Sequence, residues 1–192
     1  MRNVRKDVLT KSETHTITGR KNKMKTIRTK VYQFNELSNE ARQNAIKWFL
    51  NSFDDSFAWE DTKEDASQIG LKLISLSDNH ANKGEFMLSA NEVAQNILTN
   101  HGESCETYKT AQTFMEQWQP VFNNYMDENH ADYESSESED TLQELEDEFL
   151  QSLLEDYRIM YNNQVEYEYS DEFAKDTIEA NEYEFTEDGR RF

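Results

Sequence analysis

The sequence DTLQELEDEFLQSLLEDYRIM, residues 140–160, decides the helical character of the chain. Its apolar residues recur at the three- and four-residue spacing of an amphipathic helix, and Thr141 and Glu144 are spaced as a capping box at its start. At about 100° per residue, apolar side chains fall on one side and five carboxylates within an arc of about 100° on the other. The apolar side comprises Leu142, Leu145, Phe149, Leu153 and Met160, and the acidic side comprises Asp140, Glu144, Asp147, Glu148 and Glu155.

Further helices and strands are predicted before and after this helix. Runs rich in β-branched and apolar residues predict strands near 26–34, 71–76 and 85–88, the last two forming a hairpin. Helices are expected after a cap at Ser38, over 57–69, after the capping box of Ser89 and Glu92, over 107–118 and over 170–181. Pro120 is expected to interrupt or kink the fourth of these. The expected fold class is α+β, predominantly helical, with a small antiparallel sheet and an acidic C-terminal helical region.

The charge of the chain is unevenly distributed. The 192 residues include 39 Asp and Glu against 20 Lys and Arg, a formal net charge of −19. Residues 1–30 contain ten basic and two acidic residues, a net charge of +8, so residues 31–192 have a net charge of −27. We therefore expect a flexible basic leader over 1–23 and a single acidic α+β domain over 24–192, with a mobile acidic loop near 127–140. The leader is either an upstream extension or a basic arm that binds nucleic acid.

Composition excludes several classes of protein. The aromatic fraction of 12% argues against a fully disordered chain. No run of about 18 apolar residues exists, so no membrane-spanning helix is predicted. Cys105 is the single cysteine, which excludes an internal disulfide and fits a reducing compartment such as the cytoplasm. Direct binding of nucleic acid by the acidic part is not expected, because phosphate contacts rely on Lys and Arg.

The sequence contains no motif that indicates catalysis. It lacks a nucleophile elbow, a phosphate-binding glycine loop and the His-Glu-x-x-His pattern. His101 and Cys105 have the i, i+4 spacing of metal ligands, but no second His/Cys pair completes a zinc set. We expect no catalytic residues, no metal and no cofactor. A metal-dependent enzyme built from scattered carboxylates is an alternative with no supporting motif.

The acidic helix face supports two interpretations. At a rise of about 1.5 Å per residue, its five carboxylates span roughly 22 Å, one per ~4.5 Å, and a DNA strand presents a phosphate about every 3.4 Å. The face could therefore imitate DNA, with Glu134 and Glu137 of the acidic loop adding to the contacts. Alternatively, it is only the solvated side of an amphipathic helix. The helix taken alone favours this second interpretation, but the net charge of −27 after residue 30 makes the mimic a real contender, since such self-repulsion costs stability.

Several segments resemble a known group of proteins. They are Val31–Ser38 followed by Glu40 and Ala41, then Trp59–Asp61, Ile69–Leu71 and Ala180–Arg190. Together they resemble a family of small acidic phage and prophage proteins, some of which are labelled "antitoxin of a toxin–antitoxin stability system". The resemblance covers roughly 25–192 and brings no catalytic residues. It implies a phage or prophage product in a bacterial cytoplasm that binds and blocks a host protein.

Two functions follow as hypotheses. The first is a non-enzymatic protein that inhibits a basic, nucleic-acid-binding host or defence protein, with contacts from the acidic face and loop. The second is an antitoxin that neutralises a cognate toxin by direct contact. The sequence makes no prediction of oligomeric state.

Overall fold

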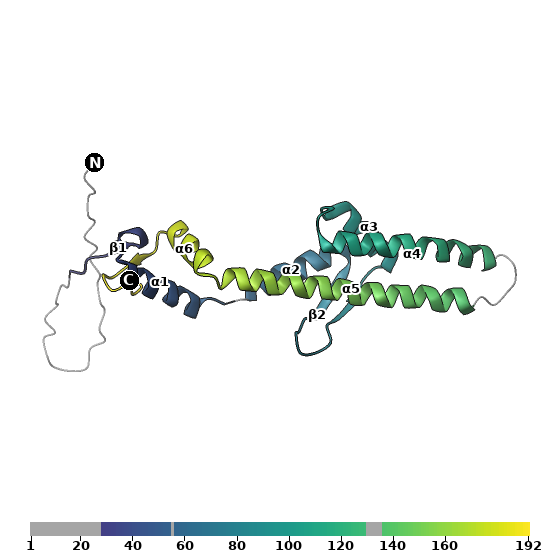
Figure 1. Ribbon diagram of the computed structural model, residues 1–192, viewed down its shortest axis with the longest axis horizontal. Helices are drawn as coiled ribbons and strands as arrows, with labels where there is room; N and C mark the ends of the chain where they lie inside the picture. Colours follow the sequence, from purple (N-terminus) through teal and green to yellow (C-terminus); the bar gives the residue numbers. More distant parts are fainter. Residues whose placement is uncertain (1–27, 55, 130–135) are drawn as a thin grey trace, which may run out of the picture. The chain divides into compact units, whose positions relative to one another are not determined.

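The computed structural model describes residues 28–54, 56–129 and 136–192. The predicted leader over 1–23 lies outside the described residues. Within them the chain forms six α-helices, one short 3-10 helix and four short strands, which confirms a predominantly helical α+β fold (Figure 1). Where the sequence predicts one acidic domain over 24–192, the chain divides into two compact units. Unit 1 comprises Met1–Phe53 and Glu168–Phe192, and unit 2 comprises Asp54–Tyr167.

Unit 1 joins segments from both ends of the sequence. In chain order it contains β1 (Tyr32–Gln33), the 3-10 helix η1 (Phe34–Glu36), α1 (Asn39–Ser52), α6 (Asp171–Ala180) and β4 (Glu184–Phe185). The cap predicted at Ser38 forms: its Oγ accepts a hydrogen bond from Ala41 N at 3.2 Å. α6 begins with a cap of the same kind, in which the Oγ of Ser170 accepts a hydrogen bond from Phe173 N at 3.1 Å. These serines satisfy amide groups that would otherwise lack partners in the first turns of α1 and α6.

The strand predicted near 26–34 is much shorter than expected. Only Tyr32 and Gln33 form β1, because Phe34 turns into η1 and is buried there. β1 pairs antiparallel with β4, Tyr32 opposite Phe185, so it does not join the predicted sheet of 71–76 and 85–88. The single sheet predicted is therefore wrong: the described residues form two separate two-stranded sheets.

The core of unit 1 packs α1 and α6 against β4. Its most central aromatic side chain, Phe185, is fully buried. Gly189 closes the unit after β4, with φ of +82°. A Cβ atom there would lie 2.0 Å from the carbonyl oxygen of Ala41, so only glycine lets this turn approach α1 so closely. The remaining buried side chains are Phe34, Leu37, Ala41, Ala45, Ile46, Phe49, Ala174 and Ile178.

Unit 2 begins with a helix, a hairpin and a second helix. α2 (Ser56–Ile69) ends at Gly70, whose φ of +91° favours glycine. β2 (Leu71–Ser75) pairs antiparallel with β3 (Lys83–Phe86), which confirms the predicted hairpin. α3 (Ala90–Asn100) begins at the predicted capping box of Ser89 and Glu92.

The two long helices of unit 2 differ from the sequence prediction at their ends. α4 (Glu106–Asn129) continues through Pro120, so the proline does not interrupt it. α5 (Ser136–Glu168) begins five residues before Thr141, so the capping box predicted there is wrong. The acidic loop predicted near 127–140 is correspondingly shorter, and residues 130–135 between the helices lie outside the described ones. Glutamate has a high helix propensity, and packing against the opposite helix extends both helices beyond their local signals.

α4 and α5 run antiparallel and form the centre of unit 2 (Figure 1). The rings of Phe114 and Phe149 stack with centroids 4.2 Å apart. Most of the predicted apolar side of α5 is inward, but Met160 is 42% exposed and Leu154 is only 1% exposed. Leu154 is covered because it lies against Gly84 of β3, which has no side chain of its own. Within the described residues, no helix has an apolar stretch of the length needed to cross a membrane.

Candidate functional site

The negative charge of the chain belongs almost entirely to unit 2. Residues 54–167 contain 26 Asp or Glu and five Lys or Arg, so the formal charge of unit 2 is −21. Unit 1 contains 13 acidic and 15 basic residues, a formal charge of +2. Eight of those basic residues and two of the acidic ones belong to residues 1–27, outside the described ones, so the described part of unit 1 has a formal charge of −4. The excess of negative charge is therefore concentrated in unit 2, which is the place to look for an acidic interface.

Four of the five cations of unit 2 are already paired with acidic neighbours. Three lysines form exposed ion pairs of 2.6–2.8 Å with glutamates nearby in the fold. Arg158 pairs with both Asp78 and Glu155. The basic side chains of unit 2 thus leave most of its carboxylates without a counter-charge. The lysine pairs are Lys63 with Glu60, Lys72 with Glu85, and Lys109 with Glu106.

The N-terminal half of α5 carries the most exposed group of predicted contact residues. Asp140, Glu144, Asp147 and Glu148 are all exposed, and none makes an ion pair with another described residue. We call these four residues the acidic ridge. Asp140, Asp147 and Glu148 each lie three or four positions from Glu144, so the ridge extends over neighbouring turns of one exposed side of the helix. Asp147 also accepts a hydrogen bond of 2.9 Å from Gln143.

The two remaining loop residues of the prediction cannot be placed in the ridge. Glu137 belongs to the first turn of α5. Glu134 lies outside the described residues.

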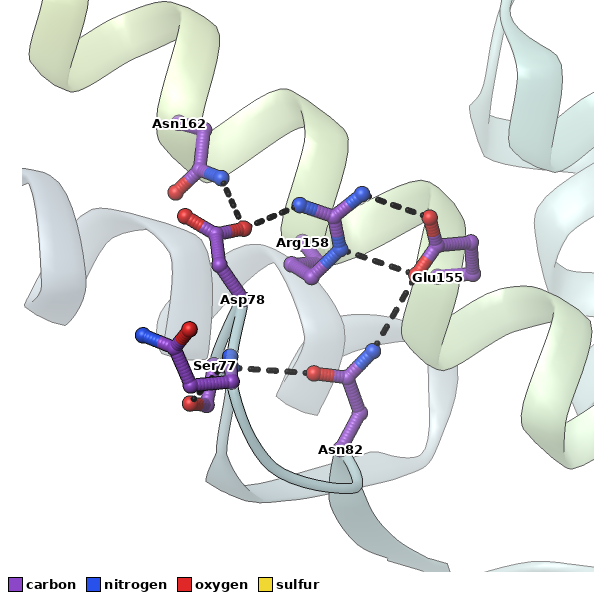
Figure 2. Close-up of polar contacts among 7 residues, drawn as sticks. Ser77, Asp78, Asn82, Glu155, Arg158 and Asn162 are labelled. Carbon is purple, nitrogen blue, oxygen red and sulfur yellow. Dashed lines mark hydrogen bonds and ion pairs between the residues drawn. The ribbon is translucent and has the colours of Figure 1, made fainter.

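Glu155 has a different environment from the ridge. Its carboxylate accepts hydrogen bonds from Arg158 at 2.6 and 2.9 Å and from Asn82 at 3.2 Å (Figure 2). The hydrogen bonds from Arg158 hold the pKa of Glu155 below its usual value. Its negative charge is therefore partly compensated within the fold, which separates this residue from the four ridge carboxylates.

The contacts of Glu155 belong to a polar cluster that fixes the β2–β3 loop to α5. Asp78 accepts hydrogen bonds from Arg158 and, at 2.9 Å, from Asn162 (Figure 2). Across the loop, Ser77 N donates to Asn82 Oδ1 at 3.0 Å. The hydrogen bonds from Arg158 to Glu155 and to Asp78 raise the pKa of Arg158, so the cation persists at any physiological pH. We call these residues, with Glu155, the hairpin clasp.

A groove between α4 and α5 lies beside the ridge. Its volume is about 340 Å³, and the stacked rings of Phe114 and Phe149 contribute to its floor. Glu148, a ridge residue, lines it from α5, so the groove and the ridge share a carboxylate. The other lining residues are Lys109, Thr110, Thr113, Gln117, Leu145 and Ser152.

One carboxyl group next to this groove has an unusual environment. Asp156 is partly buried and accepts a hydrogen bond of 2.7 Å from Thr110. Burial raises its pKa, and the nearby charges of Glu106 and Glu155 add to the effect. The ionised form of Asp156 is therefore electrostatically unfavourable at this contact between α4 and α5.

The sequence did not predict a partly buried polar network that joins α2, α3, α4 and α5. The hydroxyl of Tyr157 donates to Asp65 Oδ2 at 2.8 Å, and His101 Nε2 lies 3.9 Å from the same oxygen. His101 Nδ1 lies 2.7 Å from the hydroxyl oxygen of the fully buried Thr107. Here His101 joins core elements through a hydroxyl, while Cys105 is exposed. No local spacing signals this network, because Asp65 and Tyr157 are 92 residues apart.

Neither a metal-binding group among the described side chains nor a similar protein indicates a further site. In the ranges that the structure describes, no three His, Cys, Asp or Glu side chains are grouped so that they could hold a metal ion. No family model matches the chain, and neither the curated proteins nor the solved structures include a similar one. The resemblance to acidic phage proteins therefore stays a prediction from the sequence. The exposed carboxylates of unit 2 are the structural feature that indicates a function.

Proposed function

We propose that this chain is a non-enzymatic acidic protein of phage or prophage origin that binds and inhibits a basic, nucleic-acid-binding protein in the bacterial cytoplasm. Unit 2 is the binding part, and the acidic ridge of α5 takes the place of a nucleic-acid backbone. The observation that carries the proposal is the formal charge of −21 on unit 2, whose cations are mostly paired elsewhere, together with four exposed ridge carboxylates.

The physical basis is electrostatic complementarity. Proteins that bind nucleic acid present Lys and Arg to its phosphates, and a group of exposed carboxylates offers them an alternative set of counter-charges. Such contacts speed association and weaken steeply as salt rises, because exposed charges are screened over about 8 Å at physiological ionic strength.

The proposal is tested by reversing the ridge charges. Full-length protein with Glu144→Lys, Asp147→Lys and Glu148→Lys should lose the basic proteins that the wild type captures from bacterial lysate at 50 mM salt. Duplex DNA added as a competitor should release the same proteins from the wild type. Circular dichroism checks that the variant keeps its helical content.

A matched control reverses three exposed acids of unit 1. Glu172→Lys, Asp176→Lys and Glu179→Lys, all on α6, change the net charge by the same amount and should leave capture intact. Equal loss in both triple variants would show that only total charge matters and would contradict a role for the ridge. Capture of a single protein encoded beside this chain, insensitive to DNA, would favour the antitoxin hypothesis instead.

A further inference from the structure

The groove between α4 and α5 combines an apolar floor with hydrogen-bond acceptors from both helices. Leu145 and the edges of the stacked Phe114 and Phe149 rings supply the apolar part. Thr113 and Ser152 supply hydroxyl oxygens, and further acceptors come from the amide of Gln117 and the carboxylate of Glu148. A site of this kind fits a ligand with an apolar stem and a head group that donates several hydrogen bonds.

Charge decides which head group suits the groove. Glu148 makes no ion pair with another described residue, and Glu144 lies one helical turn before it on the same face. Lys109 also lines the groove, but its ammonium group pairs with Glu106 at 2.6 Å. An incoming cation would therefore meet an uncompensated carboxylate and a lysine whose charge is already countered.

We propose that this groove is a receptor for one arginine side chain of the basic partner, seated between α4 and α5 with its guanidinium at Glu148. The proposal rests on the proposed function and specifies where the partner anchors. Arginine has five donors in a planar fork, enough for the carboxylate and the neighbouring hydroxyl and amide oxygens, and its stem packs on apolar surface. A volume of about 340 Å³ is near the lower limit of ligand pockets and has room for one or two side chains.

Two pairs of variants of the full chain distinguish binding in the groove from general electrostatic attraction to the acidic surface. Glu148→Gln and Asp147→Asn remove the same charge from adjacent ridge positions, but only Glu148 lines the groove. Thr113→Trp fills the groove from an exposed position without changing charge, and Gln112→Trp places the same ring at an exposed position outside its lining.

The measurement is fluorescence anisotropy of a labelled nona-arginine peptide at 50 mM salt. We expect Glu148→Gln and Thr113→Trp to weaken binding about tenfold, and Asp147→Asn and Gln112→Trp to weaken it less than twofold. Nona-lysine should bind more weakly than nona-arginine and should respond little to Thr113→Trp.

Each contrary result has a defined meaning. Equal weakening by Glu148→Gln and Asp147→Asn would overturn the groove and leave the acidic interface standing. Equal behaviour of the two peptides across all four variants would overturn the assignment of arginine. If the wild type binds neither peptide, both the groove and the proposed function are wrong. Should Thr113→Trp fail to fold by circular dichroism, the pair at 147 and 148 decides alone.

Discussion

Replacing Glu144 by lysine should stabilise unit 2. Glu144 lies four residues from Asp140 and Glu148 and three from Asp147, so its carboxylate has three like-charged neighbours on the exposed face of α5. Each such helical pair is worth about 0.2–0.5 kcal/mol, unfavourable for like charges and favourable for opposite ones. Reversing one charge changes the sign of three pairs, a gain of about 1–3 kcal/mol in the free energy of unfolding. For a unit of roughly 100 residues, each kcal/mol raises Tm by about 4–8 °C, so Tm should rise by at least about 4 °C.

The assay is thermal unfolding followed by circular dichroism at low salt and at 1 M NaCl. The gain should largely disappear at 1 M NaCl, where the Debye length of about 3 Å is shorter than the ~5–6 Å between neighbouring Cβ atoms. Glu144→Gln removes the repulsion without adding attraction and should give about half the gain. An unchanged or lower Tm for Glu144→Lys at low salt, or a gain that persists at 1 M NaCl, would refute the reasoning. If the ridge binds a partner, the variant that gains stability should also lose affinity.

Three further predictions address positions outside the ridge. Gly189→Ala should destabilise unit 1 by more than about 2 kcal/mol in urea unfolding, because its Cβ would meet the backbone of α1 and its φ is +82°. Gly102→Ala, whose Cβ would lie 4.0 Å from the Ser104 hydroxyl oxygen, should change stability by less than about 1 kcal/mol. Asp156→Asn should raise Tm at pH 7, because the folded-state pKa of Asp156 is raised and its ionised carboxylate therefore destabilises the fold. The protonated carboxyl has no such effect, so stability falls as pH rises through that pKa, and the Tm difference between the Asn variant and the wild type should vanish in acid. Arg158→Met should speed hydrogen exchange of the β2–β3 loop amides, since it removes the ion pair to Asp78, and unchanged exchange would contradict the hairpin clasp.

Local signals in the sequence predicted the elements that depend on local chemistry. Ser38 and Ser89 each cap a helix as expected, because a capping hydroxyl needs only amides two or three residues away. The capping box at Thr141 failed for the opposite reason. Helix α5 starts earlier, and its extent follows from packing against α4, which the local sequence does not encode.

Pairings between distant segments could not be predicted. β1 and β4 have two residues each, which is too short for a recognisable alternation of apolar and polar residues. The sequence therefore could not predict that they pair across about 150 positions. The ridge could be predicted because each residue of an α-helix is rotated by about 100° from the last, so sequence spacing alone shows which carboxylates share a face. The full environment of Glu155 was not predicted, since Asn82, which donates to it, and Asp78, which shares Arg158 with it, come from a loop more than 70 residues earlier.

The pairing of β1 with β4 also determines the order in which the two units can fold during translation. At roughly 5–20 residues per second, β4 leaves the ribosome about 8–30 s after β1. All of unit 2 is made in that interval and can fold while α1, without α6 and β4 to cover Ala45 and Phe49, still exposes its apolar face. A nascent chain halted within α5 would therefore already carry most of the acidic unit beside an unfinished unit 1, and would depend on chaperones that hold exposed apolar helices.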